Sequence, residues 1–278
     1  MHLMTSLLVL LSVGCCLCAP AEAQQRGQPK ESQQPSSTSG DSTDPGVKKL
    51  KATLQKEKDP KRRAEAISSL GRNEEALEVL IAALTDRHPQ VREAAVAALG
   101  DLAHPKAVEP LIATLNDKDP EVKTAAAAAL GRLRDPKAIA PLTAFLRKEA
   151  LAGGDLGGKK ARTGSKVVAA SAFTAAGALG HLGEEGFEAL AATLRDPAPQ
   201  VRRSAVVGLI FTARDRSVDL FIAALKDTDA LVRLYAVSGL ATTRATRALE
   251  PLRSLVEEET EPSVRAKAEE VLQQIEGR

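Results

Sequence analysis

The chain has 278 residues, and its 38 Lys and Arg side chains nearly balance its 36 Asp and Glu side chains. It contains no Trp, one Tyr and five Phe. This balance excludes the broad basic face of a nucleic-acid-binding protein, and the shortage of aromatic rings argues against stacking platforms for single strands and against aromatic cages for cations.

Residues 1–23 have the pattern of a secretory signal peptide. The apolar run LMTSLLVLLSVGCCLC is followed by the triplet Ala-Glu-Ala, which ends just before Gln24. An apolar core followed by such a triplet is typical of a cleaved leader, and the run is too short for a convincing membrane span. We therefore expect cleavage after Ala23 and an exported protein that is periplasmic, held in the cell envelope or secreted.

The cysteines leave a second interpretation open. Cys15, Cys16 and Cys18 all lie in the signal region, so cleavage after Ala23 leaves a mature chain without thiols. Such a chain has no disulfides, thiol nucleophiles or zinc–thiolate sites. Alternatively, the segment Ser-Val-Gly-Cys resembles a bacterial lipobox and implies a lipid on Cys15; an uncleaved anchor is the third alternative.

Residues 24–46, QQRGQPKESQQPSSTSGDSTDPG, carry no apolar side chain apart from Pro. Such a segment cannot bury enough surface to offset the entropy lost on ordering, so it is predicted to be disordered. It is either a tether that lets a domain stand off from a membrane or wall, or an ordinary ragged N-terminus. The folded domain is therefore expected to cover residues 47–278.

One phrase recurs throughout this domain. It reads PQVREAAVAALG at 89–100, PEVKTAAAAALG at 120–131 and, more loosely, PQVRRSAVVGLI at 199–210. A common alignment position recurs at intervals of 29, 31, 49, 30, 31 and 32 residues. A period near 31 residues is the signature of stacked repeats, and the long interval indicates an insertion. The aligned positions are Arg62, Val91, Val122, Ser171, Val201, Val232 and Val264.

Each repeat predicts two helices. In the first, Val91, Ala95 and Leu99 lie on one helical face. Asp59 and Asp119 precede a Pro, as a capping carboxylate does at a helix start. A left-handed Gly is expected to end the first helices. The glycines concerned are Gly71, Gly100, Gly131 and Gly180.

The second helix is exemplified by AVEPLIATL, in which Val108, Leu111 and Leu115 share one face. A Pro inside a helix breaks it, so the prolines of the second helices must lie in the first turn. These are Pro110, Pro141 and Pro251. Neither helix can bury its apolar stripe alone, so the repeats must stack.

The pattern resembles the HEAT repeat family, in particular the short HEAT-like repeats of phycobilisome lyases. It is carried here by Asp86, Val91, Arg92, Ala95, Leu99, Gly100, Ala107, Val108, Leu111 and Leu115. The resemblance implies an all-α, right-handed solenoid of about six to seven stacked two-helix repeats, with the second helices on the concave side. It also implies that Asp and Arg side chains tie repeats together, a role that fits Asp86/Arg92, Asp117/Lys123, Asp196/Arg202 and Asp227/Arg233.

The second helices carry a column of acidic residues at one aligned position, interrupted by Ala140. If the repeats stack about 10 Å apart, these carboxylates form a spaced ladder on the concave face. They are either a groove for a basic or amide-rich partner segment or a solvated face held by i,i+3 pairs such as Lys106–Glu109 and Arg247–Glu250. The column consists of Glu78, Glu109, Glu188, Asp219 and Glu250.

The insertion, at about 147–168, reads RKEALAGGDLGGKKARTGSKVV. Its glycines and its basic residues Lys159, Lys160 and Arg162 predict a mobile basic loop at the edge of the solenoid. Such a loop either contacts an anionic surface or is a tolerated, flexible addition.

The sequence predicts no catalytic residue, cofactor or metal. His88, His104 and His181 lie at predicted helix ends, and none has a His or Glu at the spacing of a metal site.

Three functions remain open. The first is an exported, non-catalytic scaffold that binds a protein partner of unknown identity through its concave surface. The second, by analogy with the bilin lyases, is an enzyme or enzyme subunit. The third is an envelope protein anchored by a lipid on Cys15 that contacts the membrane surface through its basic loop.

Overall fold

The computed structural model describes residues 44–153, 163–212 and 214–277, and the side chains of 163–169 and 214 are not described. The predicted signal segment with Cys15 and most of the predicted linker lie outside these ranges. Within them every regular element is a helix, and no strand occurs. The prediction of an all-α fold is confirmed, and the first described helix begins at Pro45, two residues before the predicted domain boundary.

The helices alternate between two kinds along the chain, as the repeat predicted. The first helices are α3 (Pro60–Ser69), α5 (Pro89–Leu102), α7 (Pro120–Leu133), α9 (Thr163–Gly180), α11 (Pro199–Ile210), α13 (Ala230–Thr243) and α15 (Pro262–Glu276). The second helices are α2 (Pro45–Lys56), α4 (Leu77–Ala83), α6 (Val108–Thr114), α8 (Ile139–Ala152), α10 (Gly183–Thr193), α12 (Arg214–Ala224) and α14 (Leu249–Glu258). Short 3₁₀ turns precede four of them, at Glu74–Ala76, Pro105–Ala107, Pro136–Ala138 and Thr246–Ala248.

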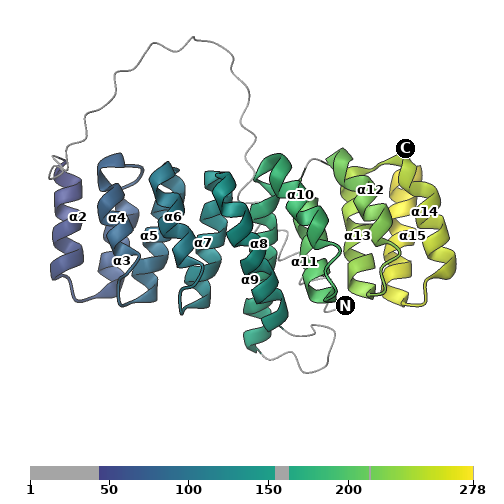
Figure 1. Ribbon diagram of the computed structural model, residues 1–278, viewed down its shortest axis with the longest axis horizontal. Coiled ribbons are helices and arrows are strands. Elements are labelled where there is room, and N and C mark those ends of the chain that lie inside the picture. Colours follow the sequence, from purple (N-terminus) through teal and green to yellow (C-terminus); the bar gives the residue numbers. More distant parts are fainter. Residues whose placement is uncertain (1–43, 154–162, 213, 278) are drawn as a thin grey trace, which may run out of the picture. The chain divides into compact units, whose positions relative to one another are not determined.

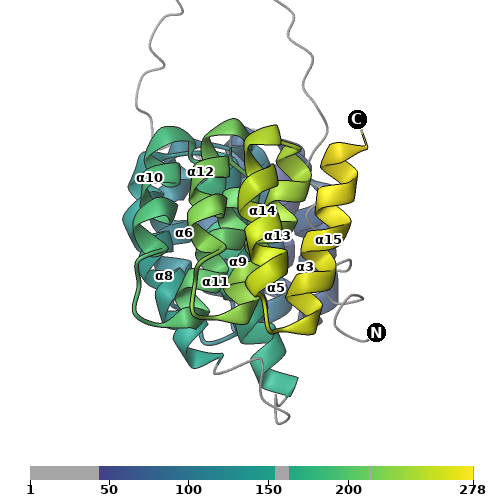
Figure 2. The same cartoon turned by 90° about the vertical axis from the view of Figure 1, so that its right-hand side faces the viewer.

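The helices follow one another in chain order (Figure 1), with each first helix packed against the next first helix and each second helix against the first helix that follows it. Seen along the row, the first and second helices form two layers (Figure 2). The chain is therefore a solenoid of stacked two-helix repeats, in which each repeat covers the apolar side of its neighbour.

The helix starts follow from local sequence. The Asp59 carboxylate accepts a hydrogen bond from the Lys61 N–H at 2.9 Å, and the Asp119 carboxylate accepts one from the Glu121 N–H at 3.0 Å. Each is followed by a Pro in the first helical position, where a missing N–H costs nothing. Pro110 lies in the first turn of α6, as predicted.

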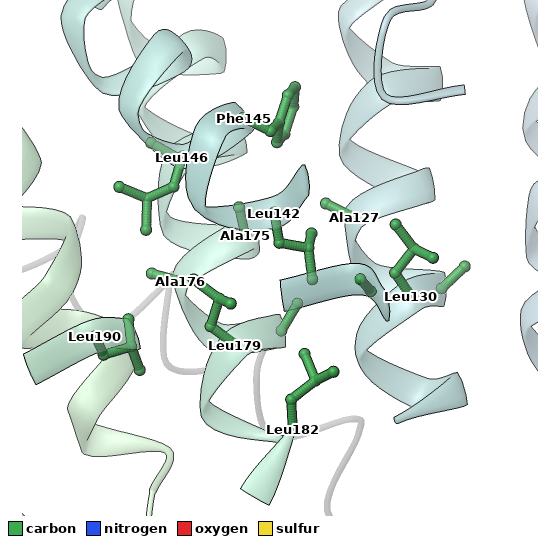
Figure 3. Packing of buried hydrophobic residues seen from close by; sticks show 14 of the residues in the cluster. Ala127, Leu130, Leu142, Phe145, Leu146, Ala175, Ala176, Leu179, Leu182 and Leu190 are labelled. Carbon is green, nitrogen blue, oxygen red and sulfur yellow. The ribbon is translucent and has the colours of Figure 1, made fainter. Parts of the chain in front are cut away.

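The core runs between the two layers. Val91, Ala95 and Leu99 of α5 are fully buried, as the helical periodicity predicted. Figure 3 shows the packing beside the long interval of the repeat, where Leu142 and Leu146 of α8 meet α9. Small alanines on the first helices allow adjacent helices to approach closely.

The glycines of the first helices do not all end them as predicted. Gly71 has the expected positive φ of 65°, but Gly100 and Gly131 lie inside α5 and α7, which end two residues later. Gly180 is the last residue of α9, and its φ is not positive. The left-handed residue after α5 is Ala103, with φ of 54°. The prediction of left-handed, helix-ending glycines is therefore confirmed at Gly71 and wrong at the other three.

Gly131 has a packing role instead. A Cβ at this position would lie 2.8 Å from the Ala178 Cα of α9, which is closer than two carbon atoms can approach without a shift. The residue is therefore required to be Gly because the backbones of α7 and α9 come close there.

A ladder of ion pairs joins consecutive repeats, but its register differs from the prediction. Arg92 binds the Asp117 carboxylate of the following repeat through two hydrogen bonds of 2.7 Å, and it donates to the Asp86 carbonyl of its own loop at 2.8 Å. The carboxylate partners predicted within one loop (Asp86/Arg92, Asp117/Lys123, Asp196/Arg202 and Asp227/Arg233) are wrong by one repeat. The ladder pairs are Arg63–Asp86, Arg92–Asp117, Lys123–Glu149, Arg147–Asp196, Arg202–Asp227 and Arg233–Glu259.

The ladder alters the acidity of its members. Burial opposes ionisation of Asp117, yet hydrogen bonds from Arg92 and from the Asp119 N–H hold its pKa below the ordinary value. The hydrogen bond from Arg233 is the main reason that the pKa of Glu259 is lowered. These two carboxylates, Asp117 and Glu259, are therefore more easily ionised in the stack than in an unfolded chain.

The long interval of the repeat is where the ladder changes. Ala172 of α9 stands at the position that carries Arg or Lys in other repeats, so it cannot bind the next carboxylate. Two residues of the elongated α8 compensate: Glu149 accepts from Lys123 at 2.7 Å, and Arg147 binds Asp196 at 2.8 Å.

The predicted insertion is shorter as a loop than the sequence indicated. Its first residues extend α8 to Ala152, and its last residues belong to α9, which begins at Thr163. Both ends of the segment 147–168 are therefore helical rather than loop, because they continue the two helices that flank the insertion.

Candidate partner-binding surface

The acidic column lies on the exposed side of the second helices, one residue in each. All five carboxylates are exposed, and so is Ala140, which interrupts the column on α8. Each follows a buried or half-buried apolar residue in the first turns of its helix, so the apolar stripe that anchors the helix also sets the direction of the acidic side chain. We call the exposed side of α4, α6, α8, α10, α12 and α14 the second-helix face.

The carboxylates in the C-terminal half of this column are paired. Glu188 lies 3.7 Å from Arg216, and Asp219 lies 3.0 Å from Arg247. In both pairs the arginine belongs to the following repeat. The predicted i,i+3 pair between Arg247 and Glu250 is therefore wrong, because Arg247 reaches back to α12. The last acid of the column is paired with Arg253 of its own helix instead.

Arg216 is held by several groups at once. Its guanidinium lies 4.3 Å from the centre of the Phe187 ring, and it also binds the Glu184 carboxylate of α10. A cation over an aromatic ring is attracted by the negative face of that ring. This part of the second-helix face is therefore occupied by contacts within the stack.

The N-terminal half of the column is different. Glu78 on α4 and Glu109 on α6 form no ion pair with any residue in the described ranges, and the predicted pair between Lys106 and Glu109 is not found there. Two repeats thus carry exposed carboxylates whose charge no described side chain neutralises.

A depression of about 340 Å³ opens between α8 and α10. Its walls include Thr143 and Arg147 of α8, together with Ala192, Thr193 and Asp196 from α10 and the loop after it. Both threonines donate to carbonyls of their own helices, so the lining is mainly apolar. The Arg147–Asp196 ion pair lies at this depression, where the repeat interval is longest.

Two features of this face were not predicted from the sequence. Half-buried isoleucines follow the acidic position by three residues, and exposed alanines follow it by four. The same alignment that revealed the acids would have found both rows, because they recur at fixed offsets. The isoleucines are Ile81, Ile112 and Ile222, and the alanines are Ala82, Ala113, Ala144, Ala192 and Ala223.

The predicted contact residues of the insertion, Lys159, Lys160 and Arg162, lie outside the described residues. Beside the insertion, Leu151 near the end of α8 is 46 % exposed. Among the described residues it is the one large apolar side chain that is exposed.

The histidines lie at helix ends, as expected. The ring of His104 accepts a hydrogen bond from the Lys106 N–H at 3.1 Å and caps a turn. Burial, with a smaller effect of Arg134, lowers the pKa of His181. Across residues 44–153, 163–212 and 214–277, no three His, Cys, Asp or Glu side chains come together as metal ligands would.

Among the described helices, none is both long enough and apolar enough to cross a bilayer.

Several solved structures are similar to this chain. Importin beta aligns with 82 % of this chain and with 35 % of its own, at 16 % identity and a TM-score of 0.54. An archaeal HEAT-like repeat protein from Thermococcus onnurineus NA1 matches 83 % of this chain and 97 % of its own at 15 % identity, with a TM-score of 0.49. The CpcE–CpcF phycocyanin lyase complex from Nostoc sp. PCC7120 matches 89 % of this chain and 100 % of its own at 22 % identity, with a TM-score of 0.46.

Comparison of sequences identifies the family. No curated protein sequence is significantly similar to this chain. The family model described as HEAT repeats matches residues 47–111, 77–152 and 187–273, which together make up more than half of the chain. With its stacked helix pairs and the match of this model, the chain belongs to the HEAT repeat family.

Proposed function

We propose that this chain is an exported, non-catalytic scaffold that binds a protein partner through its second-helix face. A stack of repeats presents a continuous surface that no single helix offers, and HEAT-type solenoids are built for such contacts. The observation that carries the proposal is the exposed pair Glu78 and Glu109, whose negative charge no described side chain neutralises. Exposed charge of one sign attracts a partner segment of the opposite sign.

The depression between α8 and α10 adds a second element. Its apolar lining suits an aliphatic side chain, and a buried anchor in a recess contributes more binding energy than contacts at the rim. We therefore expect a partner segment with basic residues along α4 and α6 and an apolar residue near Thr143 and Ala192.

A charge-reversal experiment tests this surface. Glu78→Lys with Glu109→Lys removes the two unpaired carboxylates without touching the stacking pairs. Partner capture by crosslinking and affinity purification from the native cell envelope is expected to fall at least about tenfold, as it does when like charges meet. Reversing Glu188 or Asp219 is less informative, because both are bound to arginines of the next repeat.

The matched control carries the same change in net charge on the other layer. Glu65→Lys with Glu93→Lys alters two exposed carboxylates of α3 and α5. If the two double variants capture the partner equally well, the second-helix face is not the binding surface. Loss of capture by the control alone would move the binding surface to the first helices.

The sequence pattern of residues 1–23 supports export, and the N-terminus of the purified protein tests it directly. Sequencing of the mature protein is expected to begin at Gln24. A lipid label on Cys15 would instead indicate an anchored envelope protein, and an intact N-terminus in the cytoplasm would contradict export. A chromophore bound to the purified protein would favour the lyase-like alternative.

A further inference from the structure

We call a second helix together with the first helix that follows it a hairpin. The ion pairs of the ladder join consecutive hairpins with the same spacing of residues. Apart from the one containing α9, each hairpin carries an acid three residues before its first helix begins and a cation three residues after that start. Interior arginines such as Arg92 and Arg233 donate to a carbonyl of their own loop and bind the acid of the next hairpin.

The first acid of the described ladder has no cation from a preceding hairpin, because no hairpin precedes it among the described residues. Glu57, in the α2–α3 loop, ends α2 as Glu259 ends α14. Its carboxylate accepts the Asp59 N–H at 3.0 Å, as the Glu259 carboxylate accepts the Glu261 N–H at 2.9 Å. Its cation in the described residues is Arg62, 3.6 Å away and largely exposed, which is not a ladder residue.

The last cation of the described ladder has no acid from a following hairpin, because no hairpin follows it among the described residues. Arg265 of α15 donates through Nε to the Glu259 carbonyl at 3.0 Å, and Nη2 donates to the same oxygen. Interior arginines such as Arg233 use these two nitrogens for the carboxylate of the next hairpin. Among the described residues no carboxylate is paired with Arg265, so its guanidinium is turned back onto its own loop.

The two terminal hairpins also carry opposite charge. Residues 44–62 contain seven Lys and Arg against three Asp and Glu, a net charge of +4. Residues 250–277 contain eight Asp and Glu against three Lys and Arg, a net charge of −5. Val91 and Val96 of α5 are buried. The residue of α3 that corresponds to Val91 is Arg62, and the residue of α15 that corresponds to Val96 is Glu269; both are exposed.

We propose that a second copy of this chain stacks head to tail on the first, with the α2–α3 hairpin of one copy against the α14–α15 hairpin of the other. The ladder would then continue from Arg265 of one copy to Glu57 of the next. Opposite charges favour this contact over head-to-head or tail-to-tail contacts, which bring like charges together. The contact is heterologous and leaves an open end on each copy, so assembly does not stop at a dimer.

The alternative occupant of these ends is water. Terminal repeats of solenoids have polar outer faces that keep the stack soluble, and charges there also serve that purpose. The two arrangements differ in how mass depends on concentration and salt, because association through exposed charges weakens as salt screens them.

Sedimentation velocity of the purified full-length chain gives the first test. In about 20 mM salt the weight-average mass is expected to rise steadily with protein concentration, past the dimer. It is expected to fall to that of the monomer in about 0.5 M salt, since at this ionic strength exposed charges are screened within a few ångströms. A monomer at every concentration in low salt would overturn the proposal. A dimer that does not grow further would overturn its head-to-tail geometry.

Charge reversal identifies the pair. Arg265→Glu alone places two acids in the contact, and Glu57→Arg alone places two cations there, so each is expected to weaken association at least about tenfold. Mixing the two variants brings opposite charges together at every contact, because each variant supplies the partner that the other lacks. Association is therefore expected to return on mixing.

Matched controls change the same net charge inside the stack. Arg87→Glu and Glu93→Lys alter exposed residues remote from the terminal hairpins and are expected to associate like the unchanged chain. Equal weakening by variants and controls, or no recovery on mixing, would show that net charge alone governs association and would overturn the Arg265–Glu57 contact. Thermal unfolding of each variant ensures that a lost contact is not a lost fold.

Discussion

The ladder between repeats is built differently in the regular stack and at the long interval. In the regular stack, Arg92 and Asp117 are both largely buried, with side chains 5 % and 11 % exposed. At the long interval α8 supplies both an acid and a cation, and Arg147 is 54 % exposed. The comparison shows that the stack accommodates an insertion when one elongated helix replaces the two groups that α9 lacks.

The difference has an energetic consequence. The attraction between two buried charges is little screened, so losing one member of such a pair is costly, whereas water screens the attraction in a pair whose cation is half-exposed. Each ion pair of the ladder is called a rung below. The rung between α8 and the loop before α11, Arg147–Asp196, is therefore expected to be the weakest, and it borders the depression on the second-helix face.

Acid acts on several ion pairs of the ladder at once and has the largest expected effect. The pKa of Asp86, Asp117, Asp196 and Glu259 is held below the ordinary value. Their contribution to stability is present above the unfolded carboxylate pKa of about 4 and is lost as pH falls through the lower folded values. Urea unfolding followed by circular dichroism is expected to show a steep loss of stability below about pH 4. Stability that stays level from about pH 7 to about pH 3, or a loss unchanged by Asp117→Asn, would contradict this.

Arg92→Ala breaks one regular rung and has the largest effect of any single substitution considered. It leaves Asp117 without its cation and removes the bond to the Asp86 carbonyl, so the free energy of unfolding is expected to fall by about 3–5 kcal/mol. Urea unfolding measures the loss. The control is Arg87→Ala, at an exposed residue of the loop before α5, which is expected to change stability by less than about 0.5 kcal/mol.

Glu149→Ala breaks the buried rung at the long interval. Lys123 loses its carboxylate but is partly exposed and reaches water, so the expected loss is smaller, about 1–3 kcal/mol. Replacing both members with apolar residues, as in Lys123→Met with Glu149→Leu, is expected to recover most of that loss. No recovery in the double variant would indicate that Glu149 acts through something other than Lys123.

Arg147→Ala has the smallest expected effect. Because the guanidinium is half-exposed, its pair with Asp196 is expected to contribute less than about 1 kcal/mol to the free energy of unfolding. Hydrogen exchange of the α10 and α11 amides would report the change locally. A loss as large as that of Arg92→Ala would abolish the distinction between the two kinds of rung.

The candidate surface was only partly predictable. The acidic column follows from alignment, because a residue one position after a buried one points away from the core in every copy. Its pairing does not follow: Arg216 and Arg247 reach carboxylates of the preceding repeat, and that distance depends on how the repeats stack. The depression between α8 and α10 has no counterpart in the sequence, since it forms between helices of different repeats.

Sequence alone determined the helices, their capped starts, their buried stripes and the need to stack, since these depend on the helical period and on neighbours a few residues apart. Only the tertiary structure decided the role of Gly131 and the partner of each ladder arginine. Both depend on the approach of residues from different repeats. Arg92 has one acid in its own loop and another in the next repeat, and the packing of one repeat on the next selects Asp117.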